Sequence, residues 1–90
     1  MADINITPLE GAAFRVEVRE GPSSSIHEVS VSPQTLEQVG WSGAPDDLIR
    51  CSFEFLLERE PKESILRQFE VGLIARYFPE WEQAARAGFR

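Results

Sequence analysis

The sequence predicts an α+β fold in a single domain spanning residues 1–90. The first observation is an alternation of apolar and polar side chains that occurs twice within residues 12–32, as in strands with one buried face. The second is the helical spacing of apolar residues across residues 33–88. The third is length, because ninety residues suffice for one hydrophobic core. We therefore expect an N-terminal antiparallel β-hairpin packed on three to four short helices.

The hairpin is predicted from two strands and the connector between them. Phe14, Val16 and Val18 alternate with charged residues over residues 12–20, and a second alternation follows over residues 26–31. Residues 20–25 contain Gly and Pro, which favour a turn. Residues 3–9, with Ile4 and Ile6, are the candidate for a third short strand.

A short helix is predicted over residues 33–39. The Ser32 hydroxyl can accept a hydrogen bond from a free first-turn amide, and Pro33 suits the first helical position because it has no amide hydrogen. Gly40 is a natural end for this helix.

The central helix is predicted over residues 46–60. Pro45 and the carboxylates of Asp46 and Asp47 favour its start, and Pro61 favours its end. Its apolar residues cover about 240° of the helix circumference, whereas one contact needs roughly 100°. This helix must be buried on two or more sides, against either the terminal helices of the same chain or another subunit. The apolar positions are Leu48, Ile49, Cys51, Phe53, Phe55, Leu56 and Leu57.

The C-terminal part continues the helical spacing from Pro61 onwards. Gly72 interrupts this pattern, so a break near residues 70–72 is expected. Pro79 imposes a further boundary, and residues 80–87 form a last short helix with Trp81 facing inward. The apolar positions of the longer segment are Ile65, Leu66, Phe69, Leu73, Ile74, Tyr77 and Phe78.

Charge and composition restrict the class of partner. The formal net charge is −6, and neither half of the chain carries an excess of bases. Nucleic acid is therefore not the expected partner, and this balance argues against broad non-specific binding to it, because such affinity depends largely on phosphate neutralisation. No apolar run approaches the ~20 residues that a membrane helix needs, and no signal-peptide pattern is visible. The single cysteine, Cys51, fits a reduced, cytoplasmic setting.

No set of residues amounts to a catalytic, cofactor or metal site. His27 is the only histidine, and strand alternation places Glu28 on the opposite face, so the acid cannot orient the ring. Zinc ligation would require further His or Cys partners at ligand spacing. Cys51 lies beyond the first helical turn among apolar neighbours, where core packing is expected. The sequence predicts a protein that is not an enzyme and has no evident small-molecule substrate.

The aromatic residues near the C-terminus have two interpretations. Tyr77, Phe78 and Trp81 lie within five residues of one another, with Arg76 adjacent. They are either interface anchors or side chains that close the core under the hairpin. Trp41 lies in a connector and is expected to be exposed. The candidate partner-binding residues are Trp41, Arg76, Tyr77 and Trp81.

The second half of the chain resembles a family of small uncharacterised bacterial proteins. The resemblance rests on EFLLEREP at residues 54–61, ESIL at 63–66 and RYFPE at 76–80. It covers residues 48–82 and implies a packing unit in a cytoplasmic bacterial protein, without a known activity, cofactor or substrate.

Residues 27–59 also resemble ribbon-helix-helix regulators and antitoxins in the order of their elements. Residues 27–31 would be the ribbon, 33–39 the first helix and 45–59 the second, with LIR at 48–50 where that family often has such a triplet. The resemblance implies an interlocked dimer that reads DNA through paired strands. The chain departs from it at the alternate strand positions Ile26, Glu28 and Ser30, of which one is acidic and none is basic. Base and phosphate contacts need basic or amide side chains.

We therefore expect a non-catalytic protein-interaction module whose partner is another protein or a second copy of the chain. The alternative is a ribbon-helix-helix-like DNA-binding regulator or antitoxin that acts as a dimer. The two alternatives differ in symmetry and in the dependence of binding on salt.

Overall fold

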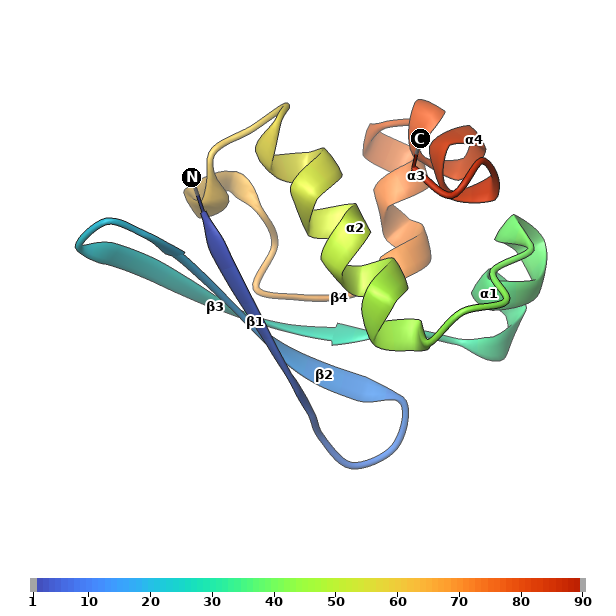
Figure 1. Cartoon of the computed structure of the whole chain (residues 1–90), viewed down its shortest axis with the longest axis horizontal. Coiled ribbons are helices and arrows are strands. Elements are labelled where there is room, and N and C mark those ends of the chain that lie inside the picture. Colours follow the sequence, from blue (N-terminus) through green and yellow to red (C-terminus); the bar gives the residue numbers. More distant parts are fainter. Residues whose placement is uncertain (1, 90) are drawn as a thin grey trace.

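The computed structural model describes residues 2–89 and confirms the α+β class (Figure 1). A single sheet has the strand order β1-β2-β3-β4. The first three strands are antiparallel neighbours, and β4 runs parallel to β3. The strands are β1 (Asp3–Pro8), β2 (Ala13–Glu20), β3 (Ser23–Ser30) and β4 (Gln68–Glu70).

Strand alternation gives the sheet one apolar and one polar face. Val16, Val18 and Val29 are fully buried on the face that the helices cover. Arg15 and its cross-strand partner Glu28 are exposed on the opposite face. The period-2 pattern of residues 12–31 thus correctly predicted which side chains enter the core.

The N-terminal strands differ from prediction in one detail. The third strand is confirmed as β1, which pairs with β2 along its whole length. The connector is shorter than expected, because β3 already begins at Ser23, opposite Glu20. Gly21 has a φ of 59°, the positive angle that a two-residue hairpin turn requires, so the serines are free to pair with β2.

Residues 31–89 contain four α-helices and two short 3₁₀ turns. The first helix begins as predicted, with the Ser32 hydroxyl accepting from the Thr35 amide, and ends at Gly40. The α-helices are α1 (Pro33–Val39), α2 (Pro45–Leu57), α3 (Ile74–Tyr77) and α4 (Glu80–Arg86), and the turns are η1 (Lys62–Ser64) and η2 (Val71–Leu73).

The central helix α2 lies between the sheet and the C-terminal helices (Figure 1). On one side the Phe53 ring meets the His27 ring of β3, with ring centroids 5.3 Å apart. On the other side the Trp81 indole N–H donates to Ser52 Oγ at 2.9 Å. Both apolar sides of α2 are therefore covered by elements of the same chain.

The prediction of a helix from Pro61 onwards is wrong for the first part of that segment. Lys62–Ser64 form only a 3₁₀ turn, and Gln68–Glu70 form β4 instead of continuing a helix. Ile65, Phe69 and Val71 are buried, and their spacings of four and two residues also suit an extended chain. Pairing with β3 decided the outcome, as in the hydrogen bond from the Glu28 amide to the Arg67 carbonyl at 2.7 Å.

Glu70 explains the break that was predicted near residues 70–72. Its carboxylate accepts from the Ser32 amide at 3.1 Å, the Thr35 hydroxyl at 2.8 Å and the Gly72 amide at 2.8 Å. A Cβ atom at Gly72 would lie 2.7 Å from Glu70 Oε1 and 2.9 Å from Thr35 Oγ1. Glycine suits this position because the side chains of Glu70 and Thr35 lie against its backbone, where a Cβ atom would be.

The sheet covers both edges of β3 at the C-terminal end of this strand. Its residues pair with β2 on one side and, at Glu28, Val29 and Ser30, with β4 on the other. Pairing of residues 27–31 with a second copy, as in a ribbon-helix-helix dimer, would require β4 to leave the sheet.

Candidate functional site

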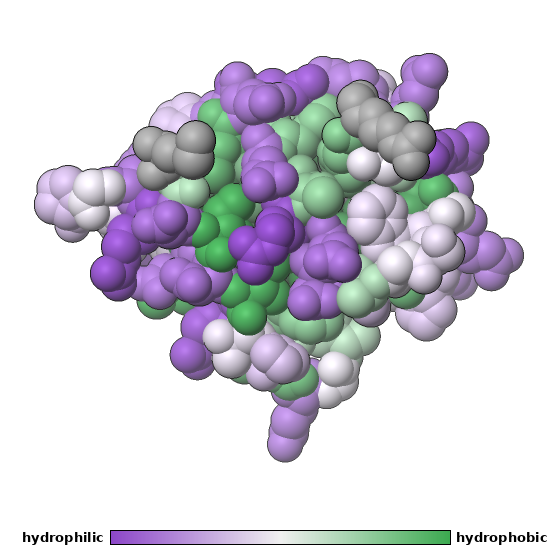
Figure 2. All heavy atoms as spheres, viewed as in Figure 1, coloured by the Kyte–Doolittle hydropathy of each residue, from purple (hydrophilic) through white to green (hydrophobic). Residues whose placement is uncertain are grey.

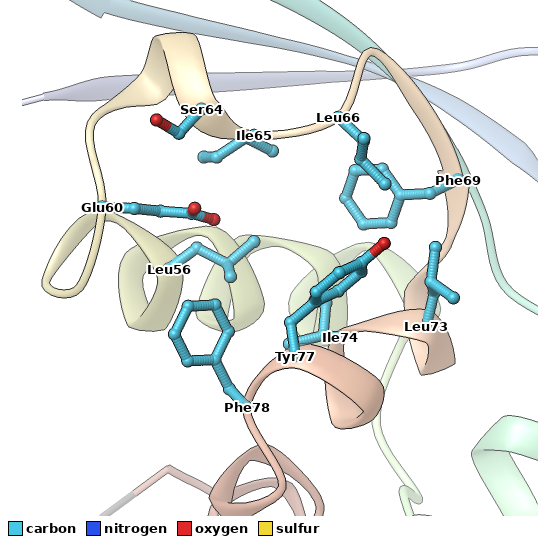
Figure 3. Close-up of a pocket in the computed structure, with 10 residues that line it drawn as sticks. All are labelled: Leu56, Glu60, Ser64, Ile65, Leu66, Phe69, Leu73, Ile74, Tyr77 and Phe78. Carbon is cyan, nitrogen blue, oxygen red and sulfur yellow. The ribbon is translucent and has the colours of Figure 1, made fainter.

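A groove opens between the chain after α2 and the helix α3 (Figure 3). Its volume is about 390 Å³. Eight of its ten lining residues are apolar or aromatic, and the other two are Glu60 and Ser64. The lining residues are Leu56, Glu60, Ser64, Ile65, Leu66, Phe69, Leu73, Ile74, Tyr77 and Phe78.

Local sequence signals build the two walls of this groove. Pro61 follows the end of α2, and after the 3₁₀ turn η1 the chain runs extended from Ile65 toward β4. On the other wall, Leu73 and Tyr77 are four residues apart and therefore lie on one face of the helical turn. Pro79 follows immediately and ends this wall.

The groove has a buried floor and an exposed rim. Leu56, Ile65 and Ile74 are buried and form part of the core. Tyr77 is 65% exposed and Leu66 is 46% exposed. Figure 3 shows the Tyr77 ring pointing from α3 toward Leu66 and Phe69. Water therefore contacts large apolar side chains at the rim, which is typical of protein-binding surfaces.

Glu60 is the only acidic residue in the lining. It is half-buried, and its carboxylate points into the groove over Leu56 (Figure 3). Burial raises the pKa of Glu60 above its ordinary value. It also lies just beyond the C-terminal end of α2, where the helix dipole disfavours a negative charge.

His27 is part of the core rather than of an accessible site. It is 1% exposed, and burial lowers its pKa. Nδ1 lies 2.7 Å from the Leu66 carbonyl, which can only accept, so Nδ1 carries the proton. Nε2 lies 2.8 Å from Ser25 Oγ and accepts from that hydroxyl. The ring is neutral, oriented and fully engaged in joining β3 to the segment before β4.

Cys51 lies on α2 and is half-buried. Burial raises the pKa of its thiol, with further contributions from the carboxylates of Glu54 and Asp47. The thiol form is therefore favoured, and the thiolate needed for nucleophilic attack is disfavoured.

The four predicted partner-binding residues occupy different environments. Tyr77 lines the groove, and Arg76 is its exposed neighbour on α3. Trp41 was expected to be exposed but is half-buried, with its indole N–H donating to the Ala44 carbonyl at 2.9 Å. Trp81 is 1% exposed, so no partner can reach it in this conformation. Tyr77 is thus the strongly exposed aromatic of the described chain.

Sequence reasoning missed Leu66 and Glu60 as residues of a candidate site. Leu66 was assigned to an apolar helical pattern, and Glu60 to the end of the central helix predicted over residues 46–60. The central helix was predicted to reach residue 60 but ends at Leu57, so Glu60 lies outside it. The common signal of both residues was Pro61, after which the chain forms a separate wall. The position of α3 opposite that wall depends on the tertiary fold.

Comparisons with protein-family models, curated proteins and solved structures find no match. Within residues 2–89, no three His, Cys, Asp or Glu side chains gather as the ligands of a metal ion would. None of the helices in that range has the length and apolar character that crossing a bilayer requires.

Proposed function

We propose that this chain is a non-catalytic protein-interaction module and that its partner docks in the groove between residues 60–69 and α3. The supporting observation is the exposure of Tyr77 and Leu66 directly above a buried apolar floor. Removing such a rim from water stabilises a complex, and tyrosine is among the residues that most often anchor interfaces.

A separate protein suits this groove better than a second copy of the chain. The surplus apolar surface of α2, which made a subunit interface conceivable, packs against β3 and α4 of its own chain. Residues 28–30 of β3 are also paired on both edges, so this part of the proposed ribbon is not free to pair with a second copy. No observation favours the DNA-binding alternative.

The absence of catalytic function is part of the proposal. His27 is buried with both ring nitrogens engaged, and the Cys51 thiol is disfavoured as a thiolate. A reduced, cytoplasmic setting is proposed on the ground that Cys51 is the only cysteine.

The proposal is tested by photo-crosslinking in cells. A photoreactive phenylalanine analogue replaces Tyr77 in one variant and Ile26 in a matched control. Ile26 is 52% exposed and lies on the outer face of the sheet, outside the groove lining. We expect a discrete protein adduct from position 77 and not from position 26.

The adduct is then identified and its affinity for the purified chain is measured. Tyr77→Ala should weaken binding at least tenfold, as expected when an interface anchor is lost, whereas Ile26→Ala should not change it. Equal crosslinking from both positions, or unchanged affinity of Tyr77→Ala, would contradict docking at the groove.

A further inference from the structure

We propose that the protein segment that docks in this groove presents a lysine or arginine, whose aliphatic stem lies on the apolar lining and whose cation pairs with Glu60. This inference rests on the proposed protein-binding function and specifies the chemistry of the partner.

The first argument is the isolation of the Glu60 carboxylate. Among residues 2–89, no hydrogen bond or ion pair satisfies its oxygens. Neighbouring cations are engaged elsewhere: Lys62 Nζ lies 2.7 Å from both Ser23 Oγ and Glu63 Oε2, and Arg59 Nε lies 3.3 Å from Glu80 Oε2. A partner could therefore supply the missing donor.

The second argument is the composition of the lining. Glu60 is the only carboxylate among ten residues that are otherwise apolar, aromatic or hydroxyl-bearing. Docking would remove further water from this carboxylate, which is costly for an anion unless a cation or donor replaces the water. A lysine or arginine suits both the apolar lining and the single carboxylate, because the stem of its side chain is apolar and only its end is charged.

The third argument is the charge of the chain, which is −6 overall. Basic segments are attracted to such a surface over longer distances, and acidic segments are repelled. Inside the groove, the Glu60 carboxylate would attract the same basic side chain at short range. An acidic or purely apolar partner segment would leave its carboxylate buried without a partner.

The experiment compares three short peptides that differ at one central position flanked by leucines. That position carries lysine, norleucine or glutamate; norleucine keeps most of the aliphatic stem and lacks the charge. Binding to the full chain is followed by NMR shifts of the amides of Leu66 and Tyr77. We expect the lysine peptide to bind roughly fivefold more tightly than the norleucine peptide, and the glutamate peptide to bind least.

The Glu60→Gln variant is the matched control, because it keeps the side-chain shape and removes the charge. It should abolish the preference for lysine and leave norleucine binding unchanged or stronger. An unchanged amide spectrum outside the groove verifies that the variant is folded. The preference for lysine in the unmodified chain should also disappear as acid protonates Glu60, whose pKa is raised by burial.

The outcomes separate the two proposals. Equal binding of the lysine and norleucine peptides, or a lysine preference that survives Glu60→Gln, overturns the pairing with Glu60 while docking in the groove stands. Binding of none of the peptides at the groove counts against both proposals, and the crosslinking at position 77 then decides independently whether the groove is used.

Discussion

At the scale of single residues, three buried or partly buried hydrogen bonds hold together segments that are distant in sequence. His27 joins β3 to the Leu66 carbonyl, Glu70 joins β4 to the start of α1, and Ser52 joins α2 to Trp81 of α4. Each contact satisfies a group that would otherwise be buried without a partner. Removing one side chain of such a pair should therefore lower the free energy of unfolding by more than the hydrogen bond itself contributes.

His27 should make the stability of the fold depend on pH. Burial lowers its pKa in the folded state, so the unfolded chain binds more protons once the pH falls below about 6.5, the ordinary histidine value. The free energy of unfolding is then highest above that pH and decreases as the pH falls toward the lowered pKa. Urea titrations at several pH values measure this decrease.

The matched variant for this prediction is His27→Asn, which keeps a donor and an acceptor but does not titrate. It should be less stable at every pH and show a smaller decrease of stability between neutral and mildly acidic pH. If both proteins lose stability with the same slope, the titration of His27 does not contribute.

Gly72→Ala should destabilise the protein by about 1–3 kcal/mol, the usual cost of overpacking. The new methyl group would lie within 3.0 Å of Glu70 Oε1, which accepts from the Gly72 amide, and of Thr35 Oγ1, which donates to Glu70 Oε2. Gly43→Ala is the control, because its nearest neighbour would be the Trp41 indole at 3.4 Å. Chemical denaturation should give a clearly lower free energy of unfolding for Gly72→Ala than for Gly43→Ala. Similar values would contradict the close packing of the Glu70 and Thr35 side chains on Gly72.

At the scale of elements, α2 is the helix on which both halves of the core depend. Its fully buried residues Leu48, Ile49 and Phe53 form part of the core cluster. The Phe55 ring packs edge-on against the Phe78 ring, with ring centroids 6.1 Å apart. The same helix provides Leu56 to the floor of the groove. The groove therefore depends on correct docking of α2 against the segments before and after β4.

Ser52→Ala should weaken the contact between α2 and α4. The variant leaves the buried Trp81 indole N–H without its acceptor, which costs about 1–3 kcal/mol. Trp81→Phe removes the donor as well, so the double variant should be less destabilised than the sum of the two single variants. Additive effects in denaturation experiments would show that the 2.9 Å contact is energetically unimportant.

At the scale of the whole molecule, the chain covers its own apolar surface. The face in Figure 2 shows apolar side chains interspersed with polar ones rather than one broad apolar area. Among residues 2–89, the exposed large hydrophobic side chains are Ile26, Leu66 and Tyr77, and the last two belong to the groove. A partner would thus gain most at the groove, where exposed and buried apolar surfaces meet.

The isolated chain should be a monomer of 10.2 kDa. Light scattering on a size-exclusion column, across a wide dilution series and at low and high salt, measures this mass directly. A concentration-independent dimer would contradict the prediction, since the surface of α2 that could have formed a subunit interface is already packed against β3 and α4.

The sequence by itself determined the elements whose signals are local. The alternation of apolar and polar residues predicted strand β2, Ser32 and Gly40 marked the two ends of α1, and Pro45 marked the start of α2. These signals depend on backbone angles and near neighbours along the chain, so they can be recognised without a fold. The excess apolar surface of α2 also followed from spacing alone.

Only the tertiary structure decided what covers α2, that residues 68–70 become β4, and that Glu60 and Tyr77 line one groove. The spacing of Ile65 and Phe69 fits both a helix and an extended chain, and hydrogen bonding to Glu28, about forty residues earlier, selected the strand. Such choices depend on contacts between distant segments, whose free energy no local pattern contains.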